Sequence, residues 1–294
     1  MPTHPPPSLE DRILDLTGRP PLDETRARLA AFRLGLLVHV TAVAVNWWTR
    51  TSPFEPPLAV RCVLAGGLLA CTLAALRPGW GRRATGAASA LVAAEVVLRL
   101  PTTANHELLG LLALLALTVF GRDDADDPRL AMAGLRWLLV IVCTWAGLQK
   151  LLSGAWLHGE FLAFEIATSE RFAVVFRYLM PAEEWMTLRG LAERLPGAGP
   201  YRLQAPLALA AAWAAWLGEL GLPPLLLWER TRRFGVVALL GLFAAIEVGA
   251  RELAFGGLFV QLTLLFWPGH PRRATLAFIV AAYVGGVAFT LGTR

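Results

Sequence analysis

Long apolar runs separated by short charged connections make up most of the chain. Six runs are long enough to cross about 30 Å of hydrocarbon as helices, at 30–48, 58–76, 84–100, 131–152, 203–228 and 274–292. Three shorter runs are bounded by charged residues or by Gly and Pro, at 107–120, 234–250 and 253–268. Because backbone amides in lipid must hydrogen-bond within their own segment, each run is expected to be helical. The pattern predicts an all-α, polytopic transmembrane helical bundle of about nine spans.

Composition supports a membrane protein over a water-soluble one. Of the 294 residues, 56% are hydrophobic and 17% charged, and the mean hydropathy is +0.53. Soluble domains carry about 25% charged residues. The net charge of +5 does not predict nucleic-acid binding, because basic residues in membrane proteins mostly mark cytoplasmic loops. Three cysteines lie in apolar runs without paired spacing and predict neither a disulfide framework nor a metal site: Cys62, Cys71 and Cys143.

The distribution of arginines predicts the orientation of the bundle. Ten arginines lie in alternate short loops, at positions 77, 82, 83, 122, 129, 230, 232, 233, 272 and 273, against three in the intervening connections, at 50, 99 and 251. The positive-inside rule then places the N-terminus in the cytoplasm and the C-terminus outside the cell (inner) membrane. Residues 1–29 mix prolines and charges and are expected to form a cytoplasmic tail with an amphipathic segment, followed by a single transmembrane domain over 30–294.

The connection at 153–202 differs from the other loops. It is about fifty residues long and combines charges with many aromatic rings, at Trp156, Phe161, Phe164, Phe172, Phe176, Tyr178 and Trp185. By the alternation of loops it lies on the extracytoplasmic side. This mixture is typical of short helices in the membrane interface and predicts a cap over the outer mouth of the bundle.

Lys150 is the single lysine among 27 basic residues, and it lies near the outer end of an apolar helix. Small residues at i−7, i−4 and i−3 share its face and leave room beside the amine: Cys143, Ala146 and Gly147. A desolvated lysine can lose its proton, whereas an arginine remains charged, so Lys150 is a candidate base or proton acceptor. The alternative is a lysine that extends its amine toward the interface.

His106 is the second candidate, at the start of the fourth span in the sequence Asn105-His106-Glu107. In the predicted orientation His106 and Lys150 both lie toward the outer half of the membrane, and they could share one cavity. The alternative is an interfacial histidine at a helix start that Asn105 or Thr103 caps.

Acidic residues within the predicted spans form a third group. Glu95 has Arg99 at i+4, which favours a structural ion pair. Glu219 lies near mid-span, where an unpaired charge costs about 2.5–3.5 kcal/mol, so a paired or functional carboxylate is expected. Glu247 and Glu252 flank Arg251 at the outer junction of the seventh and eighth spans, where salt bridging and a site role are both open.

Two further polar features are interpreted as structural rather than functional. His39 and Asn46 lie seven residues apart on one face of the first span and are expected to hydrogen-bond to neighbouring helices. The acidic run at 123–127 lies in a cytoplasmic loop and predicts a solvated turn rather than a divalent-metal site. The motifs of soluble enzymes, such as a Gly-rich phosphate loop or His-Glu-x-x-His, do not occur.

The segment at 145–159, which reads WAGLQKLLSGAWLHG, resembles the Ala-Gly-x-x-Lys…Trp-x-x-Gly segment of the vitamin K-dependent gamma-carboxylase membrane domain, also called the horizontally transferred transmembrane domain (HTTM). The start of the fourth span at 105–110 resembles the Asn-His helix start of that family. Residues 257–259, after Arg251 and Glu252, are similar to a later block. The resemblance extends over about 30–292.

The resemblance implies an enzyme that uses a reduced quinone (vitamin K hydroquinone or menaquinol-like), oxygen and carbon dioxide, without a metal. In the family a lysine amine deprotonates the quinol, oxygen adds, and the strong base that forms removes a proton from a peptide glutamate, which carbon dioxide then carboxylates. Lys150 would be that base, and His106 would hydrogen-bond the quinone oxygen. The expected cofactor-binding residues are Asn105, Gly147, Trp156, Glu219 and Glu247.

Three departures from the family limit this expectation. Gln149 stands where the animal enzyme has a second lysine, and Glu247 stands where the later block usually has a histidine. The resemblance ends near residue 292, so a C-terminal region of the kind with which animal carboxylases bind their protein substrates is not expected in this protein. A small or peptidic substrate at the outer leaflet is therefore expected, rather than a propeptide-tagged protein.

Two other functions remain open from the sequence. One is a non-catalytic membrane subunit that binds a partner in peptide maturation, export or immunity; it would tolerate changes at Lys150 and be sensitive at 153–202. The other is a transporter, for which broken helices in two matching halves would be the signal, and the sequence has none. Membrane lipid is the expected surrounding in every case.

Overall fold

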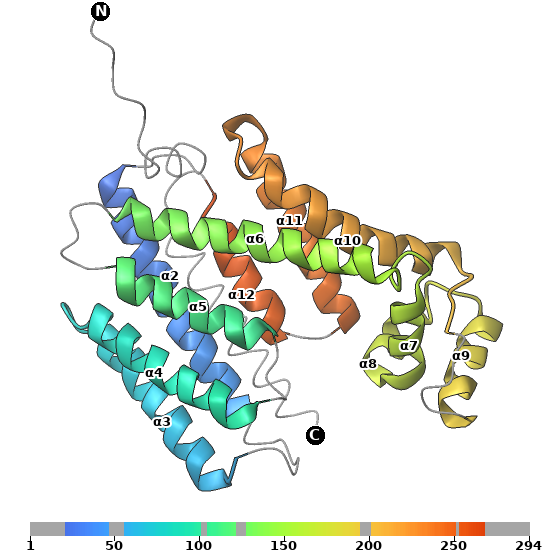
Figure 1. The fold of residues 1–294 in the computed structure, drawn as a ribbon, viewed down its shortest axis with the longest axis horizontal. Helices are drawn as coiled ribbons and strands as arrows, with labels where there is room; N and C mark the ends of the chain where they lie inside the picture. Colours follow the sequence, from blue (N-terminus) through green and yellow to red (C-terminus); the bar gives the residue numbers. More distant parts are fainter. Residues whose placement is uncertain are drawn as a thin grey trace, which may run out of the picture. The chain divides into compact units, whose positions relative to one another are not determined.

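The computed structural model describes residues 21–46, 56–100, 105–121, 128–194, 201–250 and 253–267. Within these ranges the regular structure is entirely α-helical, in eleven helices (Figure 1). The all-α prediction is therefore confirmed for this part of the chain. The predicted span at 274–292, most of the predicted tail, and the acidic run at 123–127 lie outside the described residues.

The helices belong to two compact units. Unit 1 comprises residues 1–138 and 253–294, and unit 2 comprises residues 139–252. Helix α6 (Arg129–Ser153) contributes its first part to unit 1 and its second part to unit 2. The two units are described separately below.

Helix α2 (Leu22–Asn46) is the central helix of unit 1. It packs against four other helices, α3 (Leu58–Ala75), α4 (Gly81–Arg99), α5 (Asn105–Phe120) and α12 (Leu253–Leu264). Its buried apolar residues recur at helical spacing, at Leu29, Phe32, Leu36, Leu37, Val40 and Ala44. These apolar positions form a stripe roughly 140° wide, and buried polar residues widen the buried surface of α2 toward its other neighbours, at Thr25, Arg28, Arg33, His39 and Thr41.

Hydroxyl groups link neighbouring helices inside unit 1. The hydroxyls of Thr41 on α2 and Thr72 on α3 lie 3.0 Å apart, and those of Ser89 on α4 and Thr118 on α5 lie 3.1 Å apart. Such hydrogen bonds commonly link neighbouring helices in an apolar environment. They hold α4 and α5 side by side, which matters for the buried cluster that lies between them.

Unit 2 combines a helical hairpin with three short helices. The hairpin consists of α10 (Pro206–Leu225) and α11 (Glu229–Ala250). The short helices are α7 (Glu160–Thr168), α8 (Glu170–Phe176) and α9 (Ala182–Arg194); α7 packs on both α8 and α9, and α8 packs on α11. A shared apolar core includes Leu162, Ile166, Leu188, Tyr201, Leu203 and Ala208.

Charged side chains form hydrogen bonds and an ion pair at the ends of the short helices. The guanidinium of Arg189 on α9 donates to the carbonyl oxygen of Ala167, at 3.0 Å, and to the carboxylate of Glu170, at 2.7 Å. The carboxylate of Glu184 accepts a hydrogen bond from the backbone N–H of Gln204, at 2.7 Å. Short helices are therefore present in the segment at 153–202, as predicted, and their location in the membrane interface stays a prediction.

Four of the described helices are long and apolar enough to cross a membrane, over Leu22–Val45, Leu58–Ala75, Arg129–Ser153 and Glu229–Ala250. Two shorter apolar helices cover Glu107–Phe120 and Phe255–Leu264. The predicted spans at 84–100 and 203–228 form helices α4 and α10 but are not among the four. The structure thus supports a membrane protein with several apolar helices, while the count of nine spans stays a prediction.

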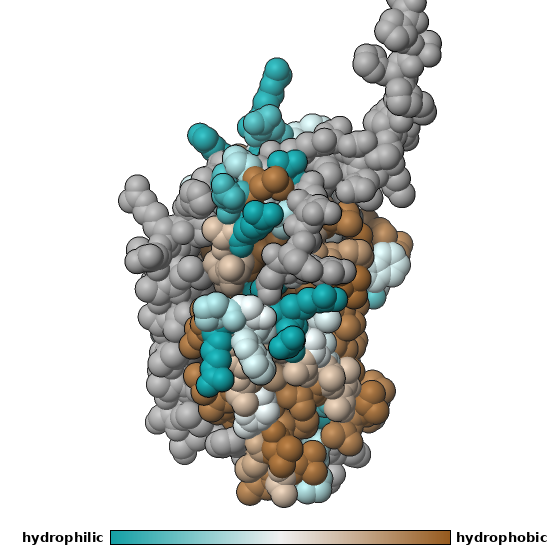
Figure 2. Space-filling view, turned by 90° about the vertical axis from the view of Figure 1, so that its left-hand side faces the viewer, coloured by the Kyte–Doolittle hydropathy of each residue, from teal (hydrophilic) through white to brown (hydrophobic). Residues whose placement is uncertain are grey.

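The outer surfaces of these helices are apolar, as expected for lipid contact. Only 28% of the most apolar window of α3 is buried, and large apolar side chains on α3 and α4 are exposed, at Leu58, Val63, Leu69, Leu73, Val97 and Leu98. On the face drawn in Figure 2, hydrophobic residues cover much of the lower part, and hydrophilic residues gather higher up. An exposed apolar surface of this kind is typical of a helix that contacts lipid or another protein.

Candidate functional site

The sole lysine of the chain forms an ion pair with a buried carboxylate. Lys150 lies in the last turn of α6, and α10 brings Glu219 against it. The Nζ atom of Lys150 donates a hydrogen bond to the Oε2 atom of Glu219. The side chain of Glu219 is 5% exposed and that of Lys150 is 21% exposed. The carboxylate therefore lies inside unit 2, and the amine lies nearer its surface.

Trp156 covers the amine from the turn that follows α6. Gly154 begins this turn with φ of 72°, a backbone conformation that glycine adopts without strain. The Nζ atom of Lys150 lies 5.0 Å from the centroid of the Trp156 ring, within the range of a cation–π contact. The indole N–H of Trp213 on α10 donates to the carbonyl oxygen of Leu157, at 2.9 Å, and holds the turn in place.

Gly147 allows α6 and α10 to approach closely. A Cβ atom at position 147 would lie 2.7 Å from the backbone nitrogen of Leu220, which is closer than real Cβ atoms come. The sequence predicted that the small residues on this face leave room beside the amine; at Gly147 the backbone of α10 fills that room. This close approach brings Glu219, the neighbour of Leu220, next to Lys150. Cys143, on the same face of α6, is 2% exposed.

The Lys150–Glu219 pair can exchange a proton without a change in net charge. The proton can lie on the amine, which gives an ammonium and a carboxylate, or on the carboxylate, which gives two neutral groups. Removing two charges from water costs several kcal/mol. Burial therefore reduces the free-energy difference between the charged pair and the neutral pair. The ring of Trp156 favours the ammonium. An arginine at position 150 would keep the ion pair but could not give up its proton.

The remaining predicted site residues are not brought to this pair by any described contact. Glu247 lies on α11 in unit 2 and is half-buried, whereas Arg251 and Glu252 lie outside the described residues. Asn105 and His106 are the first residues of α5 in unit 1, and their side chains are not among those the structure describes. The shared cavity for His106 and Lys150 therefore stays a prediction, as does the part of His106 in quinone binding.

Unit 1 contains a second cluster of buried charges. The predicted contact of Arg99 with Glu95 on α4 is confirmed, at 3.6 Å. The shorter contact of Arg99, 2.7 Å from its Nη1 atom, is with Glu107 on α5, which the sequence did not single out. The sequence feature that could have identified Glu107 is its position beside His106 in the first turn of an apolar helix. His39 on α2 is 2% exposed and lines the same cavity as the two glutamates.

No group of three or more His, Cys, Asp or Glu side chains with the arrangement of a metal site occurs among the described residues. The three cysteines are free thiols; Cys71 and Cys143 are buried, and Cys62 is exposed.

No family model matches the chain, and no curated protein or solved structure matches it either. The resemblance to the gamma-carboxylase membrane domain therefore depends on the lysine-centred and Asn-His segments alone.

Proposed function

We propose that the chain is an integral membrane enzyme in which Lys150 acts as a base toward a reduced quinone. The reaction would be proton abstraction or carboxylation of a small or peptidic substrate, as in the family that the segment at 145–159 resembles. The observation that carries the proposal is the pairing of the single lysine with Glu219 beneath the ring of Trp156.

The chemistry of the residues around Lys150 fits this role. Lys150 would accept a proton from an acidic hydroxyl group of the ligand, and the carboxylate of Glu219 would stabilise the ammonium that forms. A second cycle would require that the ammonium release this proton to the solvent, which the 21% exposure of the Lys150 side chain permits. The low exposure of Glu219 limits access of water, so a proton on the pair would not be lost at once to the solvent.

The aromatic side chains beside the pair suit a flat ring. Trp156 stacks on Phe161 with a centroid distance of 4.7 Å, and Trp213 lies on the adjoining helix. Quinone rings stack on such surfaces in the same way as other aromatic groups. A bound reduced quinone would supply the electrons for the reduction of oxygen.

We place this site toward the extracytoplasmic side of the cell (inner) membrane, with the N-terminus in the cytoplasm. The positive-inside distribution of arginines supports this orientation. In the same orientation the short helices α7, α8 and α9 form the interfacial cap. Enzymatic tagging of residues at 77–83 and 177–178 in inverted vesicles tests the orientation, because the two segments would be labelled from opposite sides.

The decisive experiment measures quinol-dependent oxygen uptake by the full chain in lipid nanodiscs, with menaquinol as the probe. Lys150→Arg keeps the positive charge and removes the exchangeable amine. Because general acid–base catalysis contributes about 10²–10⁴ in rate, we expect the uptake rate to fall at least about 100-fold. Arg177→Lys is the matched control. It also replaces one basic residue type by the other, and the Cζ atom of Arg177 lies 4.8 Å from the centroid of the Tyr178 ring.

Full activity of Lys150→Arg would overturn the role of the amine. Extraction and mass spectrometry of the purified protein provide a readout that does not depend on turnover. Stoichiometric quinone in the wild type and in Lys150→Arg, with loss of oxygen uptake only in the variant, is the expected result. Absence of both quinone and uptake in the wild type would exclude the enzyme.

A non-catalytic partner-binding subunit is the alternative, and exposed side chains on the short helices favour it. Tyr178, on the segment between α8 and α9, is 73% exposed, and Met186, on α9, is 58% exposed. A binding subunit would lose its partner in Tyr178→Ala and Met186→Ala and keep it in Lys150→Arg. Co-purification of a peptide from cells that express each variant separates the two functions.

A further inference from the structure

Three arginines gather in unit 1 where the chain turns from α3 into α4, two helices that lie side by side (Figure 1). Residues 77–80 read RPGW and form the turn, in which a backbone hydrogen bond of 3.2 Å joins the first and last residue and Gly79 has φ of 76°. Proline followed by glycine at these two places is typical of a type II turn. Because the turn is short, Arg77 after α3 and both Arg82 and Arg83 in the first turn of α4 lie at the same end of the two helices.

Two of the three guanidinium groups are held by neighbouring groups. The Nε atom of Arg82 donates to the carbonyl oxygen of Thr118 on α5, at 3.4 Å. The Cζ atom of Arg83 lies 5.7 Å from the centroid of the Trp80 ring. All three arginines are exposed, and Trp80 is 43% exposed. A guanidinium that is already held in place loses less conformational entropy when it binds an anion.

This arginine patch, formed by Arg77, Arg82 and Arg83, has no carboxylate partner among the described residues. The sequence contains no Asp or Glu between Glu55 and Glu95. Both acidic residues of α2 contact arginines of the same helix. The single acidic residue of α5 lies in its first turn, whereas α5 meets the patch in its last turn. The patch is therefore electrostatically complementary to an anion.

The apolar surface that adjoins the patch indicates that this anion belongs to a lipid. Leu69, Leu73 and Leu76 are 49%, 56% and 62% exposed, on the last two turns of α3 and directly after it. Helix α3 is one of the helices that are long and apolar enough to cross a membrane. An acyl chain beside these leucines would place its phosphate at the end of α3, next to the arginines. Guanidinium groups bind phosphate with paired hydrogen bonds, and tryptophan is common at this level of a membrane.

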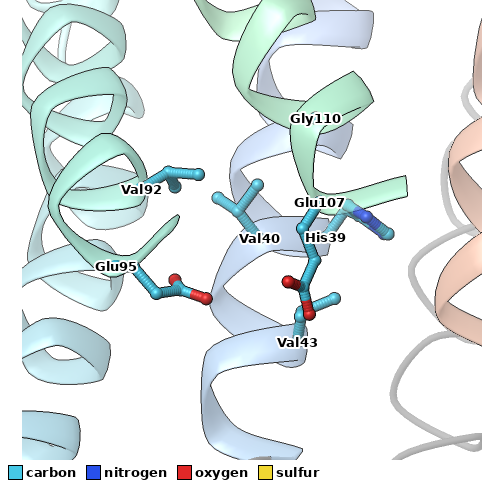
Figure 3. Close-up of a pocket in the computed structure, with 7 residues that line it drawn as sticks. All are labelled: His39, Val40, Val43, Val92, Glu95, Glu107 and Gly110. Atoms are coloured by element: carbon cyan, nitrogen blue, oxygen red, sulfur yellow. The ribbon is translucent and has the colours of Figure 1, made fainter. Parts of the chain in front are cut away.

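The patch is separate from the buried ionic cluster of unit 1. At 1.5 Å per residue, Glu95 lies about 21 Å along α4 from Gly81, where the helix begins. Figure 3 shows the carboxylate of Glu95 beside a small cavity, which is large enough for one water. Substitutions of the exposed arginines are therefore expected to leave that cluster and the fold intact.

We propose that the α3–α4 turn is a binding site for the headgroup of an anionic phospholipid. Arg77, Arg82 and Arg83 contact the phosphate, the exposed leucines of α3 contact an acyl chain, and Trp80 positions Arg83. The site lies within unit 1 and does not depend on the function proposed for the Lys150–Glu219 pair.

Native mass spectrometry of the full chain in mild detergent tests the proposal, with phosphatidylglycerol and phosphatidylcholine of identical acyl chains as the probes. Each basic residue near a membrane surface raises the affinity for anionic lipid about fivefold. The wild type is therefore expected to prefer phosphatidylglycerol about 100-fold for its tightest site. Arg82→Gln combined with Arg83→Gln should reduce this preference to about fivefold.

The turn between α10 and α11 in unit 2 provides the matched control. Arg230 and Arg233 are exposed there beside Trp228, which is 59% exposed, and Glu229 offsets part of their charge. Arg230→Gln combined with Arg233→Gln should retain the preference of the wild type for phosphatidylglycerol.

Two further variants test how the headgroup is held. Trp80→Leu keeps every charge and removes the ring beside Arg83, so the preference should fall about 2–5-fold. Trp228→Leu is its control and should have no effect. Arg83→Lys keeps the charge without the planar pair of donors and should weaken phosphatidylglycerol binding several-fold.

The outcomes are distinct. A wild type that binds the two lipids equally would overturn the proposal without any variant. Equal losses in the two double variants would assign the preference to general surface charge and would also overturn it. Displacement of the lipid by an excess of glycerol phosphate would mean that the patch binds a free anion. An unchanged preference in Trp80→Leu would contradict the positioning role of the ring.

The acidic run at 123–127, which lies outside the described residues, provides one more arm. Replacement of its four aspartates by asparagine should leave the preference in place. If the preference appeared only after this replacement, the acidic run rather than a lipid would occupy the arginines, and the proposal would be wrong.

Discussion

The two buried ionic clusters of this protein differ in the cation that each contains. In unit 2 a lysine faces one glutamate beneath a tryptophan ring, and in unit 1 an arginine lies between two glutamates. Lysine can give up its proton when it is desolvated, whereas arginine cannot. The lysine cluster can therefore move a proton within the pair, whereas the guanidinium of the arginine cluster keeps its proton and its charge.

The surroundings differ as well. The amine of Lys150 is partly exposed, at 21%, while the side chain of Arg99 is 2% exposed. Removal of the cation should consequently be far more harmful in unit 1 than in unit 2, since an uncompensated charge is most costly where water cannot reach it. Four substitutions, in order of expected effect, test this difference.

Arg99→Ala should have the largest effect on stability. It leaves the carboxylates of Glu95 and Glu107 buried without the guanidinium that contacts both, and breaking a buried pair in this way costs about 3–5 kcal/mol. Chemical or thermal unfolding of the purified protein in nanodiscs measures the loss. Arg77→Ala, at an exposed arginine of the same unit, should change the free energy of unfolding by less than about 0.5 kcal/mol. Equal losses in the two variants would contradict the assignment.

Lys150→Met should destabilise the protein by about 2 kcal/mol, less than Arg99→Ala because solvent still reaches the pair. Adding Glu219→Leu should restore most of the loss, since the second substitution removes the unpaired carboxylate. A double-mutant cycle measures the coupling between the two positions. Losses that simply add would mean that the two side chains do not interact.

Gly147→Ala should cost about 1–3 kcal/mol, because its Cβ atom would overlap the backbone of Leu220 and push α6 and α10 apart. Gly221→Ala is the matched control on α10: a Cβ atom there has no neighbour within 4 Å. That control should be neutral or slightly stabilising, since alanine is the better helix former. If both variants were neutral, the close approach of the two helices would not exist.

The coupling between Trp156 and Lys150 should be the smallest effect, about 1 kcal/mol for the contact between the ring and the ammonium, and Trp156→Leu loses in addition the packing of the ring on Phe161. The same substitution in a Lys150→Met background should cost less by about that amount. Unfolding measurements on the four members of the cycle provide this difference. An unchanged cost in the absence of the lysine would assign the role of Trp156 to packing alone.

Much of the fold follows from local pattern. Apolar runs of helical length predicted an all-α chain, and the described residues form helices at eight of the nine predicted runs. The contact between Glu95 and Arg99 was predictable because residues four apart share a helix face. Helix boundaries were less predictable: α2 begins at Leu22 rather than near residue 30, because its charged first turns continue the same helix and Arg28 finds a carbonyl acceptor at Leu265.

The candidate site was predictable residue by residue but not as an arrangement. Lys150 stood out because it is the only lysine, and Glu219 because a mid-span carboxylate requires a partner. Nothing in the sequence joined the two, since 69 residues separate them. Glu107 was missed for the same reason, because its partner Arg99 lies on the preceding helix.

Residue chemistry and helical periodicity alone thus determined the apolar helical character and the ion pair within α4, and they singled out Lys150 as the candidate base. Tertiary structure decided which carboxylate each cation contacts and where a water-sized space remains. The physical reason is that periodicity acts within a few residues along one helix. The contacts of Lys150 and Arg99, by contrast, depend on how closely two helix backbones can approach, as Gly147 permits at Leu220.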